Sequence, residues 1–494
     1  MKRIALLSLF LLSFSIHFGQ TEKEKVIETV NKSTIEGQIY FLADDVLKGR
    51  ETGTPENKIA ASYLANTLRG YGVKPSPVNG TYYQTFQLEK VTPPQKMSMK
   101  INNITYSDFV AIQPAGLNFK GDAIYMGYGL EDDYAKANVK GKLVLIDAGS
   151  PTTKDTRDAF DIREKKAKLA EAAGAAGLVE FVDTNENIWN FIQHDFNSSK
   201  LSQLKGASDP SQKLSSFTHI WALNPNGGFT KKMKPMKDML ATVQVDAAKK
   251  SRVTTQNVIG VVEGTDPKLK NEYIIYSAHY DHVGVGTPDE TGDTIYNGAR
   301  DNAIGTTTVL SMAANLAKYP TKRSALFILF TGEEKGLLGS EYYVEHPVLP
   351  LKQMVFCFNS DNGGYNDTSL ATIIGLPRTT AAANIKAGVS AFGLTAIDDP
   401  APEQGLFDRS DNVHFAAKGI PAPTFSLGFT AFNGDVTKYY HRPGDHADNL
   451  DYDYLEKFFR AYVMTGRIMG NDPVTPVWTS GDKYEEISKA LYKN

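Results

Sequence analysis

Several acidic and histidine side chains stand where predicted strands end, or in the segments that follow those strands. They share the ligand chemistry of borderline metal ions, and they are His279, Asp301, Glu333, Glu334, Asp361 and His441. Imidazole nitrogen and carboxylate oxygen without sulfur suit Zn²⁺, and also Co²⁺ or Mn²⁺. The chain has a single cysteine, Cys357, which excludes a thiolate metal cage. Ligands of open α/β sheets bind at the carboxyl ends of the strands, so these side chains are expected to converge on one edge.

Each of these residues also has an ordinary structural interpretation. Asp301 precedes a predicted helix and could simply cap it. Asp361 precedes an Asn-Gly-Gly sequence and could form a turn. Glu333 and Glu334 could be solvated loop charges, and His441 a surface histidine. Their recurrence at successive strand ends favours one shared site over separate accidents. His282 and His446 lie beside proposed site residues and are expected to pack against or support them.

The elements that would position these side chains alternate between strands and helices after Asn257. Helical patterns lie between the strands, at 303–318 and 450–469 among others. Apolar runs predict strands at 258–262, 273–277, 325–330, 354–358, 371–374 and 423–427. Continuous runs of β-branched and aromatic residues are typical of strands buried on both faces. The predicted fold is therefore α/β, with a mainly parallel, mixed sheet sandwiched by helices.

Two other regions precede this sheet. Residues 26–47 and 57–68 have apolar residues near the helical period and predict two helices. From about 104 to 248 the pattern changes to short strands, turns and one helix, with strands at 141–147 and 174–182. This stretch contains none of the proposed ligands, and we expect it to be a separate small β-rich module.

The composition is that of a globular protein. The 494 residues allow about three domains at roughly 150 residues each. Apolar residues make up 41% and charged residues 22%, which excludes a disordered or fibrous chain. Fifty-three Lys and Arg against 56 Asp and Glu give a net charge of −3. This balance leaves no basic excess for a phosphate backbone, so nucleic acid is not an expected partner. The oligomeric state is not indicated.

The N-terminus predicts a secretory signal peptide over residues 1–19. Lys2 and Arg3 precede an apolar run from Ile4 to Ile16, which is too short to span a bilayer as a helix. No cysteine stands near its end for lipid attachment. We therefore expect an exported protein, periplasmic or secreted, without a stable membrane anchor.

The ordered motifs resemble those of the M28 family of zinc exopeptidases, which includes aminopeptidases, glutamate carboxypeptidase and glutaminyl cyclase. The motifs are His279-x-Asp281, Gly298-Ala-Arg-Asp301-Asn302, Thr331-Gly-Glu333-Glu334, Asn359-Ser-Asp361 and Tyr440-His441-Arg-Pro-Gly-Asp445. The insert at 104–248 resembles the protease-associated domain of several exopeptidase families. The resemblance implies a zinc-exopeptidase-like peptidase domain formed by 20–103 and 249–494.

The same resemblance implies a role for each site residue. Asp301 would bridge two Zn²⁺ ions, with Co²⁺ or Mn²⁺ as other possibilities. His279 and Asp361 would complete one site, and Glu334 and His441 the other. Glu333 would be the general base. Two further carboxylates would orient ligands: Asp281 would hold the His279 ring, and Asp445 would act similarly.

The implied function is that of an exported aminopeptidase, which removes N-terminal residues from peptides through a water activated by two metals. A glutaminyl cyclase-like transferase is the alternative, and the insert favours the peptidase. A non-enzymatic receptor-like module is a third possibility, which the complete ligand set and Glu333 oppose. One departure concerns the substrate side: Ser410-Asp411-Asn412 stands where many relatives have Ser-Asp-His.

Overall fold

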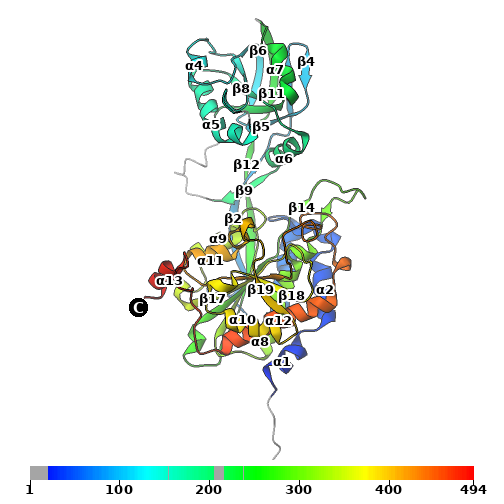
Figure 1. The fold of residues 1–494 in the computed structure, drawn as a ribbon, viewed down its shortest axis with the longest axis vertical. Helices are drawn as coiled ribbons and strands as arrows, with labels where there is room; N and C mark the ends of the chain where they lie inside the picture. The colour runs from blue at the N-terminus through cyan, green and yellow to red at the C-terminus, as the bar shows by residue number, and fades with distance from the viewer. Residues whose placement is uncertain (1–19, 154, 205–215, 237, 494) are drawn as a thin grey trace, which may run out of the picture. The chain divides into compact units, whose positions relative to one another are not determined.

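The computed structural model describes residues 20–153, 155–204, 216–236 and 238–493, which form two units (Figure 1). One unit contains the chain up to Phe86 and from Thr255 onward, and the other is Gln87–Thr254. The predicted insert lies within the second unit, whose limits are wider because β3 (Met97–Ile101) pairs with a strand of that unit. β2 (Tyr83–Thr92) and β12 (Lys249–Val262) cross the unit limits. The proposed signal peptide lies outside the described residues.

The first unit is built on a mixed sheet in the order β19-β18-β20-β17-β13-β16-β12, with β1 paired to β12. The central strands β20, β17, β13 and β16 are parallel, and β12 joins them antiparallel. β18 is antiparallel to β20 and parallel to β19. The bounds not yet given are β1 (Lys74–Pro75), β13 (Tyr273–His279), β16 (Ser324–Phe330), β17 (Met354–Ser360), β18 (Leu370–Ile374), β19 (Thr395–Asp398) and β20 (Thr424–Leu427). A separate pair, β14 (Gly284–Val285) and β15 (Ile295–Tyr296), lies beside the site described below.

Helices cover both faces of this sheet (Figure 1). Successive strand residues point to opposite faces, so Ile274 and Tyr276 belong to one apolar cluster and Ile275 to the other. On the first face lie α1 (Glu22–Thr29), α2 (Lys32–Leu42), α3 (Pro55–Gly70), α8 (Gly305–Lys318), α10 (Ala382–Ser390) and α12 (Tyr452–Asn471). On the second lie α9 (Leu338–Glu345), α11 (Asn412–Ala417) and α13 (Glu485–Tyr492). The fold is the predicted α/β sandwich.

The single helix predicted over 26–47 is wrong. The chain forms α1, α2 and a 3₁₀ segment, Asp45–Arg50. The break comes at Val30, which is extended, and at Asn31, whose side chain accepts a hydrogen bond from the Thr34 amide at 3.0 Å. Asparagine is a favoured helix N-cap, so this side chain starts a new helix where the apolar spacing alone indicated a continuous one.

The second unit has a sheet in the order β4-β3-β11-β6-β7-β8-β10-β5. Its strands not yet bounded are β4 (Ile104–Tyr106), β5 (Phe109–Gln113), β6 (Leu117–Tyr125), β7 (Leu143–Asp147), β8 (Gly177–Val182), β10 (His219–Leu223) and β11 (Met239–Val245). Its helices are α4 (Glu131–Tyr134), α5 (Thr156–Ala172), α6 (Glu186–Asn197) and α7 (Gly228–Met233). β9 (Lys200–Gln203) pairs with the end of β2. Among all the helices in the described residues, none has the length and apolar character to cross a membrane.

The core of the second unit contains a buried ionic cluster. Lys166 Nζ lies 2.6 Å from Glu180 Oε1, and His219 Nε2 lies 3.1 Å from Glu180 Oε2. Trp221 Nε1 donates to the same Oε2 at 2.7 Å. Burial opposes ionisation of Glu180, but His219 and Lys166 outweigh it and lower the pKa of the carboxyl. The cluster therefore keeps the Glu180 side chain ionised inside an otherwise apolar core.

Replacing Glu180 by leucine is expected to lower the free energy of unfolding of this unit by about 3–5 kcal/mol, because Lys166 becomes a buried charge without its partner. Urea denaturation followed by tryptophan fluorescence measures this, since Trp189 and Trp221 are two of the three tryptophans. Glu131→Gln is the control, because it breaks an exposed pair with Lys165 and should leave the midpoint unchanged. An unchanged midpoint for Glu180→Leu would contradict the prediction.

Candidate metal centre

All six predicted site residues come together at the carboxyl edge of the central parallel strands. His279 ends β13, Glu333 and Glu334 follow β16, and Asp361 follows β17. Because these three strands are parallel neighbours, their carboxyl ends lie side by side. Asp301 lies in the irregular turn before α8, and His441 in the loop after β20.

The donor atoms form two clusters that share Asp301. In the first, His279 Nε2 lies 3.2 Å from Asp361 Oδ1 and 3.3 Å from Asp301 Oδ1. In the second, His441 Nε2 lies 3.1 Å from Glu334 Oε2 and 3.2 Å from Asp301 Oδ2. Each carboxylate oxygen of Asp301 thus faces a different cluster, which is the arrangement of a bridging ligand.

These distances fit metal coordination. Zinc bonds to nitrogen and oxygen of roughly 2.0–2.2 Å place tetrahedral ligand atoms about 3.4 Å apart. The N···O separations of 3.1 to 3.3 Å are close to that value. In addition, the buried His441 Nε2 has no hydrogen bond of acceptable geometry. The first cluster offers three donors, and the second can include His282 as a fourth. A tetrahedral ion held by three protein donors keeps one position for water or substrate.

The charges around the donors favour positive charge in both clusters. Burial lowers the pKa of His441, but Asp301 and Glu334 raise it to about 10 overall. Burial disfavours the charged form of His279 as well, but Glu333, Asp361 and Asp301 raise its pKa well above the ordinary value. The same carboxylates would stabilise a dication in place of the protons.

Glu333 differs from its neighbour Glu334. Burial raises the pKa of Glu333 well above the usual range; His279 opposes this rise, and Asp361 and Glu334 add to it. Burial and Asp301 raise the pKa of Glu334, but the charge of His282, its hydrogen bond to Glu334 and the proximity of His441 bring it down to about 2. The pKa values of the two adjacent glutamates are therefore shifted in opposite directions. Such a difference is expected between an acid–base group and a neighbouring metal ligand.

Asp281 supports the centre mainly through the backbone. Its carboxylate accepts hydrogen bonds from the amides of Glu333 at 3.2 Å and Glu334 at 3.4 Å. The His279 Nδ1 atom lies 3.3 Å from the Asp281 carbonyl oxygen and 3.8 Å from its carboxylate. The carboxylate predicted to hold the His279 ring therefore holds the Glu333-Glu334 segment, and the carbonyl group is the nearer partner of the ring.

Asp445 fixes the turn that carries Asp301. Its Oδ2 accepts hydrogen bonds from the amides of Arg300 at 2.9 Å and Asp301 at 3.3 Å. Its Oδ1 binds Arg300 Nη1 at 2.8 Å. This agrees with an orienting role, exerted on the backbone of a ligand.

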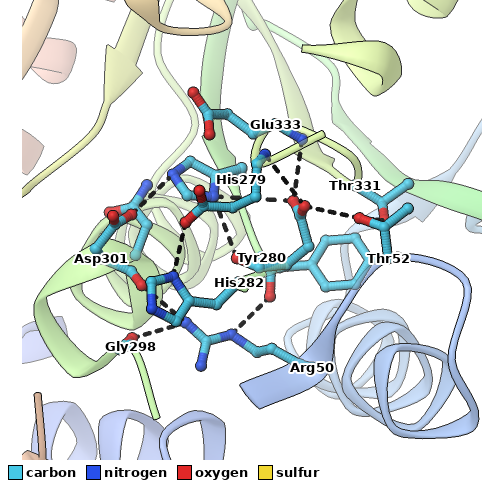
Figure 2. Close-up of polar contacts among 12 residues, drawn as sticks. Arg50, Thr52, His279, Tyr280, His282, Gly298, Asp301, Thr331 and Glu333 are labelled. Carbon is cyan, nitrogen blue, oxygen red and sulfur yellow. Dashed lines mark hydrogen bonds and ion pairs between the residues drawn. The ribbon is translucent and has the colours of Figure 1, made fainter. Parts of the chain in front are cut away.

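Three residues near the donors were not assigned a specific contact from the sequence. His282 Nδ1 lies 2.7 Å from Glu334 Oε1, the oxygen that faces away from His441. Arg50 and Thr52 reach the centre from the segment between α2 and α3, and Figure 2 shows them among the site residues. No periodic pattern marks this segment, and the sequence offers no signal that would have singled out Arg50 or Thr52. His446 instead lies 3.6 Å from Asp293.

A cavity opens beside the donors. Four proposed site residues are among those that line it: His279, Asp301, Glu333 and Asp361. Its lining also contains apolar residues, Ile374, Leu406, Phe429, Phe432 and Val436, together with polar ones such as Arg409 and Ser410. Tyr440 also lines the cavity and stacks on His441, with ring centroids 4.0 Å apart. Asn412 does not line it: its amide donates to the Phe407 and Ala422 carbonyls.

Comparison with known proteins gives two family matches. Residues 257–465 match the model of peptidase family M28, and residues 113–214 match that of the PA domain. The part of the chain that carries the donor clusters is therefore similar to peptidase family M28. The M28 match contains all the proposed ligands and Glu333, but not Arg50 or Thr52.

Several of the similar proteins carry aminopeptidase names. Aminopeptidase YwaD of Bacillus subtilis is 32% identical over 216 residues, which are 41% of this chain and 42% of that protein. Probable leucine aminopeptidase 2 of Aspergillus oryzae is 35% identical over 21% of this chain and 18% of its own length. The chain thus spans less than half the length of these curated relatives.

Two solved structures share the fold. An aminopeptidase from an Aneurinibacillus strain has a TM-score of 0.59 at 22% identity, over 93% of this chain and 98% of that one. A zinc aminopeptidase from Bacillus subtilis has a TM-score of 0.54 at 20% identity, over 92% and 97%.

The purified protein is expected to bind two divalent metal ions per chain, because two donor clusters share one carboxylate. Metal analysis after dialysis against Zn²⁺ measures the stoichiometry. His441→Ala should reduce it towards one ion, since it removes the imidazole that contacts both Asp301 and Glu334 in the second cluster. His346→Ala, which changes an exposed histidine away from the cavity, should retain both ions. A single equivalent in the unmodified protein would contradict the prediction.

Proposed function

We propose that the protein is an exported zinc aminopeptidase that removes N-terminal residues from peptides. The observation that carries the proposal is the pair of donor clusters sharing Asp301, with Glu333 beside them on the wall of a cavity. His279 and Asp361 would hold one ion, Glu334 and His441 the other. The family match of residues 257–465 and the names of the relatives support this assignment.

The chemistry is hydrolysis of an amide. Metal ions held by His279, Asp361, Glu334, His441 and the shared Asp301 would polarise the scissile carbonyl and lower the pKa of a bound water. Glu333 accepts a proton from the attacking water and returns it to the nitrogen of the leaving amine. Asp281 holds the Glu333 backbone during both transfers through the hydrogen bond to its amide. Each turnover consumes one water molecule and breaks one peptide bond.

The acidic residues of the cavity support the choice of the N-terminal end of the substrate. The carboxylates of Glu333 and Asp361 line the cavity and can accept hydrogen bonds from the free ammonium of a peptide N-terminus. The lining also contains Phe429, Phe432 and Val436, which can cover an apolar side chain. A peptide entering with its N-terminus at the carboxylates places its first carbonyl near the donor clusters.

The adjacent pair Glu333 and Glu334 provides the sharpest test. Glu333→Gln should keep both metal ions and lower kcat by about 10²- to 10⁴-fold, because only proton transfer is lost. Glu334→Gln should weaken metal binding, and added Zn²⁺ should restore part of the activity. Hydrolysis of aminoacyl reporter substrates and metal content are measured together. Near-normal turnover in metal-loaded Glu333→Gln would overturn the assignment. Cyclisation of N-terminal glutamine without peptide hydrolysis would favour the glutaminyl cyclase alternative.

Export forms part of the proposal and rests on Lys2, Arg3 and the apolar run that follows them. Expression of the full chain in a bacterial host should give a mature protein whose sequence begins near Gln20, recovered outside the cytoplasm. Replacing Leu11 and Leu12 by arginine interrupts the apolar run and should keep the precursor in the cytoplasm. N-terminal sequencing of the protein from the cytoplasmic and the exported fractions tests this prediction. An unmodified chain that stays unprocessed in the cytoplasm would contradict export.

A further inference from the structure

The guanidinium of Arg50 is fully buried and bonded on every side. It is 0% exposed, and all of its hydrogen bonds go to backbone carbonyl oxygens. Nε donates to Tyr280 at 2.7 Å, Nη1 to Leu42 at 2.9 Å and to Asn297, and Nη2 to Gly298 at 2.7 Å and Asp301 at 3.4 Å. A guanidinium has five N–H donors. Each of them therefore meets one carbonyl group, as Figure 2 shows for Tyr280 and Gly298.

Four of these five carbonyl groups belong to the two loops that carry proposed ligands, and the fifth, that of Leu42, lies at the end of α2. Tyr280 directly follows His279, and Asn297, Gly298 and Asp301 form the turn that presents the shared carboxylate. Arg50 thus joins the end of β13 to the start of α8 by a single planar group. A lysine at this position has three donors on a point charge and cannot reproduce the fork.

Thr52 acts on the loop after β16, which carries Glu333 and Glu334. Its hydroxyl donates a hydrogen bond to Asp281 Oδ2 at 2.7 Å. The Asp281 carboxylate in turn accepts hydrogen bonds from the backbone amides of Glu333 and Glu334. The hydroxyl is the one side-chain donor to Asp281 among the described contacts. Through Asp281, Thr52 fixes the backbone of both glutamates.

The segment that carries these residues is itself held in an unusual conformation. Lys48, Gly49 and Arg50 have φ values of 43°, 65° and 39°, all in the left-handed region. A side chain at Gly49 would place its Cβ 2.5 Å from the carbonyl oxygens of Gly284 and Tyr296, so the backbone is packed directly against β14 and β15. Asn57 Nδ2 also donates to the Arg50 carbonyl at 3.1 Å. Left-handed residues other than glycine persist only where their surroundings hold them, and they concentrate at functional sites.

We propose that Arg50 and Thr52 are positioning residues of the metal centre: Arg50 sets the spacing between His279 and Asp301, and Thr52 sets that of Glu333 and Glu334. The inference rests on the proposed two-metal centre and extends it to a segment outside the M28 match. Neither side chain coordinates metal. Both act on the backbone of groups that do, and loss of such support typically weakens metal binding by about 10- to 100-fold.

The test compares Arg50→Lys with Arg323→Lys in the full-length protein. Arg323 is a matched control, because it is 1% exposed and its guanidinium binds backbone carbonyls and Glu272 in the same unit. Zn²⁺ affinity is measured by competition with a chelator, and ligand geometry by the visible absorption of the Co²⁺-loaded protein. Arg50→Lys should lose about 10- to 100-fold in affinity and change the Co²⁺ spectrum. Arg323→Lys should lower the unfolding temperature and leave both metal readouts unchanged.

Thr52 gives a second, milder pair of variants if Arg50→Lys does not fold. Thr52→Val removes the hydroxyl at nearly constant size and should lower Zn²⁺ affinity and kcat, with a smaller change in KM. Thr52→Ser keeps the donor and should restore both. Equal metal affinity and Co²⁺ spectra in the unmodified protein, Arg50→Lys and Thr52→Val would overturn the proposal.

The outcomes separate this proposal from the proposed function. If the unmodified protein binds two ions but hydrolyses no aminoacyl substrate, the aminopeptidase assignment fails, and the affinity and spectral comparisons still decide the positioning roles. If it hydrolyses the substrate and the variants match it in every metal readout, only the positioning roles fail. An unmodified protein that binds no Zn²⁺ or Co²⁺ overturns both.

Discussion

The site depends on one electrostatic constraint, the crowding of carboxylates around Asp301 at the edge of a buried sheet. Asp301 shares its two oxygens between His279 and His441, and Glu334 and Asp361 lie on either side. Burying so many like charges is unfavourable unless cations meet them. The alternating helices and strands of the first unit bring these groups together, and positive charge at the centre would offset their mutual repulsion.

Arg50 and Arg300 lie outside the donor clusters and also place positive charge near the crowded carboxylates. Arg300 binds Asp445, which in turn holds the Asp301 turn, and its guanidinium lies over the Tyr439 ring at 4.1 Å. Both arginines are buried and carry permanent charge close to the carboxylates. These guanidinium groups belong to the protein and cannot exchange with solvent ions. They therefore supply a constant positive charge near the carboxylates, to which bound metal ions would add a charge that depends on metal occupancy.

Much of the fold followed from the sequence because the central strands are strongly apolar and uninterrupted. The predicted runs at 273–277, 325–330 and 354–358 each lie inside an observed strand, and the residues that follow them form the donor clusters. The predicted helix over 26–47 was wrong because a single capping side chain, Asn31, outweighs apolar spacing. Arg50 and Thr52 were missed for a different reason. Their contacts reach residues more than 200 positions away, and such pairings leave no local period in the sequence.

The distance along the chain between Arg50 and its acceptors also bears on the order in which the protein folds. Contacts of such long sequence separation close large loops, and they form late because the loop entropy is lost before the contacts stabilise it. His441 lies farther still towards the C-terminus and is needed for the second cluster. The donor clusters therefore reach their final geometry only after both ends of the first unit have met. The affinity of the donor clusters for metal would then be a property of the finished tertiary structure.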